Sequence, residues 1–166
     1  MTIRFAKLAS SLALASAIIS LSGLASAAET IKIGVSGPFT GGSSSMGVSM
    51  RDGVKLAADE INKAGGVLGR QIQLIERDDE AKNERGVQIA QELINKEKVS
   101  ATVGYINTGV ALASQRFYQE AKIPVMNNVA TGSLITQQFK DEPENYIFRN
   151  AAHDNIQASM IVEEAV

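Results

Sequence analysis

The chain has 166 residues, of which 45% are hydrophobic, 20% are charged and 5% are aromatic, a composition typical of an ordinary globular domain. It contains neither cysteine nor tryptophan, which excludes disulfides, thiolate metal sites and cysteine nucleophiles. The formal net charge is -2, and this balance argues against a nucleic-acid-binding protein, which usually carries a basic patch. Because aromatic residues are few, we expect an aliphatic core, which suits a parallel sheet covered by helices.

Residues 1–28 have the pattern of a secretory signal peptide. Arg4 and Lys7 form a basic start, residues 8–24 are mainly apolar, and residues 25–27 are small, as a cleavage site requires. A retained membrane anchor is the alternative, but it needs about 20 apolar residues and this segment is short and rich in serine. We therefore expect export to the periplasm, which leaves 14 basic against 18 acidic residues.

Apolar periodicity predicts four strands that alternate with three helices. Strands are expected where apolar residues alternate, and amphipathic helices where they recur at three- and four-residue spacing. In chain order, strands are expected at residues 31–35, 71–77, 99–104 and 123–126, and helices at residues 48–64, 83–98 and 109–121. This order, with its short connections, predicts an α/β fold with a doubly wound parallel sheet and helices on both faces.

The segment after the fourth predicted strand is less regular. We expect a short helix at residues 133–140, an extended piece at residues 146–149 and a helix from residue 155 onward. The sequence stops at the apolar Val166 without a capping glycine or a polar tail, so we expect it to be truncated before a further strand.

The loops after the four strands are expected to share one rim, because ligands of open parallel sheets bind beyond the carboxyl ends of the strands. Thr108 stands where a helix begins, so it can cap that helix while its hydroxyl and the free amides beside it face the rim and suit a carboxylate. A cap with no further role is the alternative. The other residues expected at the rim are Tyr105, Asn107, Val129 and Thr131.

Other kinds of site fit the sequence less well. Residues 42–47 match the first half of a phosphate-binding loop, but Val48 stands where a lysine is needed, so nucleotide binding is not expected. The acidic cluster at residues 78–80 has no further ligands at metal spacing, and we interpret it as a solvated strand end. The only histidine, His153, has no paired acid or nucleophile motif, so we expect neither catalysis nor a cofactor.

Two stretches carry a family resemblance: IKIGVSGPFTGGSSSMG at residues 31–47 and GVKLAADEINKAGGVLGRQIQLIERDDEAK at residues 53–82. With the signal peptide, they resemble the periplasmic solute-binding proteins of branched-chain amino-acid ABC transporters. The resemblance implies the type I periplasmic-binding fold, in which two Rossmann-like α/β lobes, joined by three crossovers, close over a ligand. Residues 29–149 would form an incomplete amino-terminal lobe, and residues 150–166 a crossover and the first helix of the second lobe.

The resemblance also assigns roles at the rim. Thr108 matches the serine or threonine that binds the ligand carboxylate, while Val129 and Thr131 match the backbone carbonyl and the hydroxyl that hold the ammonium and the carboxylate. Met46 stands nearest the place of an aromatic ring that often covers the ligand side chain. The implied ligand is an amino acid or a similar small carboxylate, and the implied partner is an ABC permease, without cofactor or metal. The alternative is the extracytoplasmic sensing domain of a signalling receptor.

Overall fold

The computed structural model describes residues 29–165, so the predicted signal peptide at residues 1–28 lies outside the described part of the chain. Five strands are present: β1 (Ile31–Gly37), β2 (Ile72–Asp78), β3 (Ala101–Gly104), β4 (Val125–Asn127) and β5 (Ile147–Arg149). The α-helices are α2 (Ser44–Lys63), α3 (Asn83–Glu92), α4 (Thr108–Ala121) and α5 (Asp154–Glu164). A π-helical turn (Leu93–Glu97) extends α3, and a 3-10 turn (Ser133–Thr136) follows β4.

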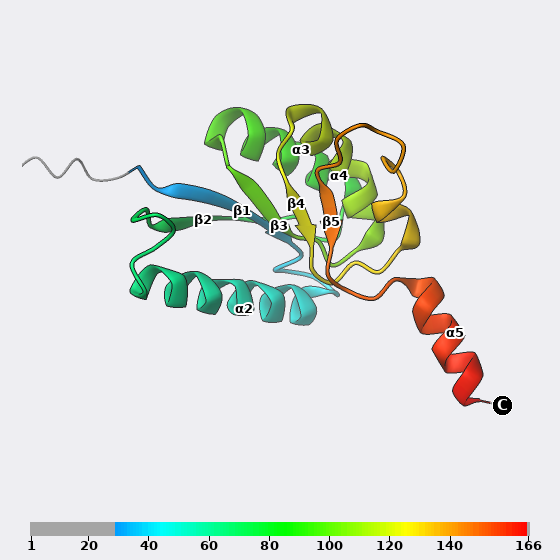
Figure 1. Cartoon of the computed structure of the whole chain (residues 1–166). Coiled ribbons are helices and arrows are strands. Elements are labelled where there is room, and N and C mark those ends of the chain that lie inside the picture. Colours follow the sequence, from blue (N-terminus) through cyan, green and yellow to red (C-terminus); the bar gives the residue numbers. More distant parts are fainter. Residues whose placement is uncertain (1–28, 166) are drawn as a thin grey trace, which may run out of the picture.

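All strand pairs are parallel, and the strand order is β2-β1-β3-β4-β5. Helix α2 covers one face of the sheet, while α3 and α4 cover the other (Figure 1). The predicted α/β class and doubly wound parallel sheet are therefore confirmed. In this order the chain changes direction across the sheet between β1 and β3, which is where such sheets bind ligands.

Three elements differ from the sequence prediction. Helix α2 begins at Ser44. The prediction placed its start at residue 48, because the serine-rich first turn lacks the apolar spacing on which that prediction was based. The helix expected at residues 133–140 is only a 3-10 turn. The extended piece at residues 146–149 pairs with β4 and becomes the fifth strand of the sheet.

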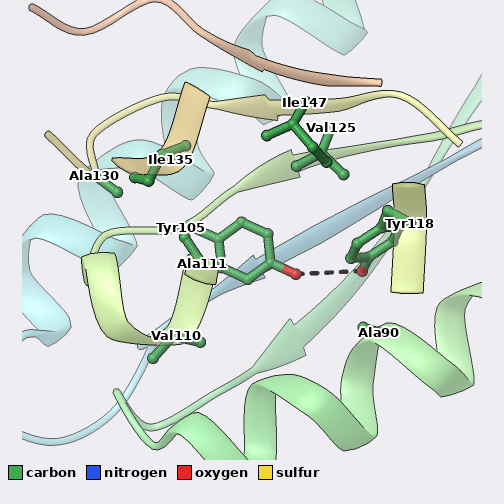
Figure 2. Close-up of a cluster of buried hydrophobic side chains, with 9 residues drawn as sticks. All are labelled: Ala90, Tyr105, Val110, Ala111, Tyr118, Val125, Ala130, Ile135 and Ile147. Atoms are coloured by element: carbon green, nitrogen blue, oxygen red, sulfur yellow. Dashed lines mark hydrogen bonds between the residues drawn. The ribbon is translucent and has the colours of Figure 1, made fainter. Parts of the chain in front are cut away.

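The largest core cluster fills the space between the sheet and helices α3 and α4 (Figure 2). Within it the hydroxyl groups of Tyr105 and Tyr118 lie 3.4 Å apart and form a buried hydrogen bond. Helices α3 and α4 approach closely at Gly86, where a Cβ atom would collide with Val110. The glycine is therefore needed for this helix contact.

The opposite face is only partly covered. Val35, Met50 and Ile106 form a smaller cluster there, and an apolar groove of about 810 Å³ runs between α2 and strands β1 to β3. Met126 and Phe148 alternate with the core residues of β4 and β5, so they lie on this same face and are 37% and 46% exposed. A large part of the α2 face is thus open in residues 29–165.

Helix α5 projects away from the sheet and buries none of its residues (Figure 1). His153 caps it, because the imidazole Nδ1 accepts a hydrogen bond from the Ile156 amide at 3.4 Å. No helix within residues 29–165 combines the length and the apolar character that crossing a membrane requires.

Candidate ligand-binding site

The carboxyl ends of the strands meet at one edge of the sheet. The parallel registers place Gly37 beside Asp78, Ser36 beside Gly104, and Gly104 beside Asn127. The loop after β1 leads to α2 on one face, whereas the loop after β3 leads to α4 on the other. The predicted shared rim is confirmed, and the chain leaves it toward opposite faces of the sheet after β1 and after β3.

Thr108 connects α4 to the loop that follows β4. Its hydroxyl oxygen accepts a hydrogen bond from the Gly132 amide at 3.2 Å. The prediction that Thr108 caps the helix is wrong, because Asn107 is the N-cap residue and no side chain caps this end. Within residues 29–165 the Thr108 hydroxyl donates to no group, so its proton is available to an acceptor that is not part of this lobe.

The loop after β4, residues 128–132, is held by its backbone. The Asn128 amide donates to the Gly104 carbonyl, and the Ala130 amide donates to the Tyr105 carbonyl, each at 3.0 Å. Within residues 29–165, neither the Val129 carbonyl nor the Thr131 hydroxyl takes part in a hydrogen bond. The loop is therefore fixed in place and yet presents unused polar groups.

Gly132 permits the close approach of this loop to α4. A Cβ atom at this position would collide with the methyl group of Thr108. Any larger residue would push the loop and the helix apart, so the hydrogen bond between Gly132 and Thr108 depends on the glycine.

Met46 lies in the first turn of α2 and is 52% exposed. It lines the mouth of the apolar groove together with Ser49, Asn128 and Val129. The structure thus brings Met46 and Val129, which are far apart in the sequence, to one surface beside the rim.

The Tyr105 side chain does not face the rim, so that prediction is wrong. It is completely buried and belongs to the core beside α3 and α4 (Figure 2). Strand alternation would place it on the side of Val103, which lines the groove, but Tyr105 has a left-handed backbone with φ of 64°. This conformation turns the ring to the opposite face.

Asn107 remains at the rim and is half-buried. Its side-chain oxygen is buried and accepts no hydrogen bond from the residues that the structure describes. A buried acceptor without a donor is costly, which is consistent with a donor that arrives with a ligand or a water molecule.

The acidic cluster after β2 fastens the first rim loop, which the sequence did not predict. The Asp78 carboxylate accepts hydrogen bonds from the Phe39 amide at 2.8 Å and the Thr40 hydroxyl at 2.6 Å. Burial opposes ionisation, but the donors Thr40, Glu80 and Phe39 together lower the pKa of Asp78. Asp78 therefore holds the loop that leads to α2 and Met46.

Asp79 is 1% exposed, so the interpretation of this cluster as a solvated strand end is wrong for this residue. Its carboxylate accepts hydrogen bonds from the Ser36 hydroxyl at 3.3 Å and the Ala81 amide at 2.9 Å. Burial dominates over these donors and raises the pKa of Asp79. The two neighbouring carboxylates thus have opposite electrostatic behaviour.

Sequence reasoning also missed Arg149, the last residue of β5. Its guanidinium donates to the carbonyls of Thr131 and Gly132 at 3.0 and 2.9 Å. Both partners are main-chain atoms, so no pair of complementary side chains in the sequence signals this contact.

A parallel sheet whose strand-end loops share one rim defines an α/β lobe, and comparisons with known proteins specify its family. The profile of the Periplasmic binding protein family matches residues 30–166. The chain belongs to this family, and the solved structures that it resembles are solute-binding proteins and not enzymes.

Two curated relatives are each 32% identical to this chain. One is the Leu/Ile/Val-binding protein homolog 3 of Brucella melitensis, matched over 95% of this chain and 40% of its own length. The other is the leucine-, isoleucine-, valine-, threonine- and alanine-binding protein of Pseudomonas aeruginosa, matched over 85% of this chain and 37% of its own length. The chain therefore spans about two fifths of these relatives.

Two solved structures have the same fold over 75% of this chain. The branched-chain amino acid transporter substrate binding protein LivJ from Streptococcus pneumoniae, in complex with isoleucine, is 30% identical, with a TM-score of 0.70 and 34% of its chain covered. A solute binding protein of an ABC transporter from Rhodopseudomonas palustris, in complex with 3,4-dihydroxybenzoic acid, is 34% identical, with a TM-score of 0.66 and 32% covered. The present sheet is thus one lobe of a type I periplasmic binding protein.

Proposed function

We propose that this lobe is the carboxylate-binding half of a periplasmic solute-binding protein, which captures a branched-chain amino acid or a related small carboxylate for an ABC importer. The names of the Brucella and Pseudomonas relatives support an amino acid as the ligand. The two ligands seen in similar structures, isoleucine and 3,4-dihydroxybenzoic acid, both contain a carboxylate.

The observation that carries the proposal is the set of hydrogen bonds that the Thr108 hydroxyl makes. Within residues 29–165 it accepts from the Gly132 amide and donates to no group, so its proton is available to an anionic acceptor. The amides of Gly109 and Val110 lie in the first turn of α4 and have no partner within that helix. Together these donors form a site for a carboxylate at a helix N-terminus.

Two further groups support an α-amino acid over a simple acid. The Val129 carbonyl is an acceptor that suits an ammonium group, and the Thr131 hydroxyl offers another donor to the carboxylate. Met46 lies beside Val129 at the mouth of an apolar groove, where a flexible thioether packs well against an aliphatic side chain. We therefore expect isoleucine, leucine or valine to bind more tightly than aromatic acids.

The proposed mechanism is capture by lobe closure without chemistry. This lobe supplies the carboxylate contacts, a second lobe supplies the acidic partner of the ammonium, and the ligand stabilises the closed form that the permease recognises. The basic and apolar pattern of residues 1–28 supports export to the periplasm by a cleaved signal peptide.

Titration calorimetry of the full-length protein tests this proposal with three ligands. Isoleucine is expected to bind, isoleucinamide to bind at least about tenfold more weakly because it lacks the carboxylate, and 3,4-dihydroxybenzoate to bind weakly because it lacks the ammonium. Equal affinities for isoleucine and its amide would contradict a carboxylate site. If only 3,4-dihydroxybenzoate binds tightly, the ligand is an aromatic acid and not an amino acid.

A further inference from the structure

Arg149 occupies the point at which the chain leaves the sheet. It ends β5, and the chain then runs to α5, which projects from the lobe. One guanidinium nitrogen, Nη1, donates to the carbonyls of both Thr131 and Gly132, and the other, Nη2, lies 3.4 Å from the Thr136 hydroxyl. The planar fork of arginine suits several acceptors at once, whereas a lysine ammonium is a single point charge.

The charge of Arg149 is directed at the loop after β4 (residues 128–132, called the ligand loop below) and not at a carboxylate. The side chain is half-buried, and none of the salt bridges found within residues 29–165 includes it. A half-buried guanidinium that is compensated by carbonyl groups binds them through charge-assisted hydrogen bonds. Its contacts therefore restrain the main chain of residues 131–132.

The restrained peptide lies between the proposed carboxylate donor and the outgoing helix. On one side, the Gly132 amide donates to Thr108. On the other side, the Thr131 carbonyl, which Arg149 holds, also accepts a hydrogen bond from the Asp154 amide at 3.0 Å, at the first residue of α5. Arg149 thus joins the ligand loop to the segment that leads out of the lobe.

We propose that Arg149 is the positioning residue of the carboxylate site. It fixes the peptide of Thr131 and Gly132, so that the Gly132 amide keeps the Thr108 hydroxyl proton directed toward the ligand. The same contact ties this loop to the start of α5. The inference rests on the proposed function, because it assigns Arg149 a role in the same carboxylate site.

The first test is a double-mutant cycle in the full-length protein, with isoleucine affinity measured by calorimetry. Arg149→Met is expected to weaken binding at least about tenfold, and Arg149→Lys by less, because lysine keeps the charge but not the fork. When Thr108→Ala is already present, adding Arg149→Met is expected to weaken isoleucine binding by a further factor of less than about two. Both changes disable the same donor, so their effects on affinity do not multiply. Fully multiplicative losses, or unchanged affinity in Arg149→Met, would overturn the proposal.

Arg116→Met is the matched control. Arg116 is an exposed arginine on α4 whose guanidinium lies over the Phe117 ring, 4.6 Å from its centre, away from the ligand loop. It is expected to change the isoleucine affinity less than about twofold, since it holds no group of the site. A loss as large as that of Arg149→Met would indicate a general effect of removing a cation and would overturn the positioning role.

A second readout separates this inference from the proposed function and does not need a ligand. In Arg149→Lys, hydrogen exchange of the Gly132 amide is expected to accelerate at least about tenfold, while the amides of β1 and β3 exchange as before. If isoleucine binds to no variant but Gly132 exchange responds, the proposed function fails and the loop restraint stands. If isoleucine binds and Gly132 exchange is unchanged, the positioning role is overturned.

Discussion

The Thr108 hydroxyl is the side-chain group most directly tied to the proposed ligand. Thr108→Ala removes the donor and leaves the Gly132 amide without its acceptor, so carboxylate ligands are expected to bind more weakly by about 1–3 kcal/mol. Thr108→Ser keeps the hydroxyl and is the control. Calorimetry with isoleucine measures both, and equal affinity of the alanine variant and the wild type would assign Thr108 a purely structural role.

Asp78 and Asp79 give a paired prediction on stability and pH. The folded pKa of Asp78 lies below its unfolded value near 3.8, so its contribution to stability is present above that pH and is lost as the pH falls through the folded pKa. Asp78→Asn is therefore expected to lower the free energy of unfolding at pH 7 by on the order of 1 kcal/mol. The difference from wild type should shrink toward pH 3.

The contribution of Asp79 to stability depends on pH in the opposite direction, because its folded pKa is raised above the unfolded value. Its stabilising contribution is complete below about 3.8 and is lost as the pH rises through the folded pKa. The free energy of unfolding of Asp79→Asn should therefore increase relative to that of the wild type as the pH rises. Urea unfolding of both variants from pH 3 to pH 7 distinguishes the signs, and parallel pH profiles would contradict the opposite environments of the two carboxylates.

For single residues of the site, the sequence predicted positions better than contacts. Strand ends and the resemblance predicted Thr108, Val129 and Met46 near the rim, and the structure places Thr108 at the start of α4 and brings Met46 and Val129 together beside the rim. Tyr105 was misplaced because its left-handed backbone has no signature in a non-glycine residue. Arg149 was missed because its acceptors are main-chain carbonyls, and every residue type supplies those.

Among the elements, α2 offers a matched pair of glycines. A Cβ atom at Gly47 would collide with the Pro38 carbonyl, whereas one at Gly53 would meet no atom within 4 Å. Gly47→Ala is expected to destabilise the lobe by about 1–3 kcal/mol and to weaken ligand binding, because it shifts the turn that carries Met46. Gly53→Ala is expected to stabilise the helix by about 0.5–1 kcal/mol.

Thermal unfolding and isoleucine calorimetry of the two glycine variants test this contrast. Equal effects of the two substitutions would show that helix propensity, and not the contact with Pro38, governs this end of α2.

Regular elements were predictable where apolar spacing continued over several turns or strand residues, as in β2, α3 and α4. The short helix predicted at residues 133–140 does not form in full, because a contact with another element intervenes. The Gln115 side chain donates to the Ile135 carbonyl at 3.2 Å, so this carbonyl bonds to a side chain of α4 and not to an amide of a continuing helix. Such a long-range contact leaves no local pattern in the sequence.

For the whole molecule, lobe closure makes a quantitative prediction. Residues 29–166 alone are expected to bind isoleucine at least about tenfold more weakly than the full-length protein, a difference of about 1.4 kcal/mol or more, because they lack the second lobe that the proposed closure requires. Calorimetry on both forms measures the difference. Equal affinities would rule out closure of two lobes as the source of binding.

The apolar groove along α2 has a consequence for how the protein is made. Met126 and Phe148 add to an apolar face that residues 29–165 leave open, and the three crossovers implied by the resemblance would return later parts of the chain to this lobe. Contacts between distant segments slow folding, so we expect this apolar face to stay exposed in the newly made chain until those later segments pack on it. Such a delay would favour the proposed export through machinery that needs an unfolded polypeptide. A dye that fluoresces on apolar surfaces should bind residues 29–166 far more than the full-length protein.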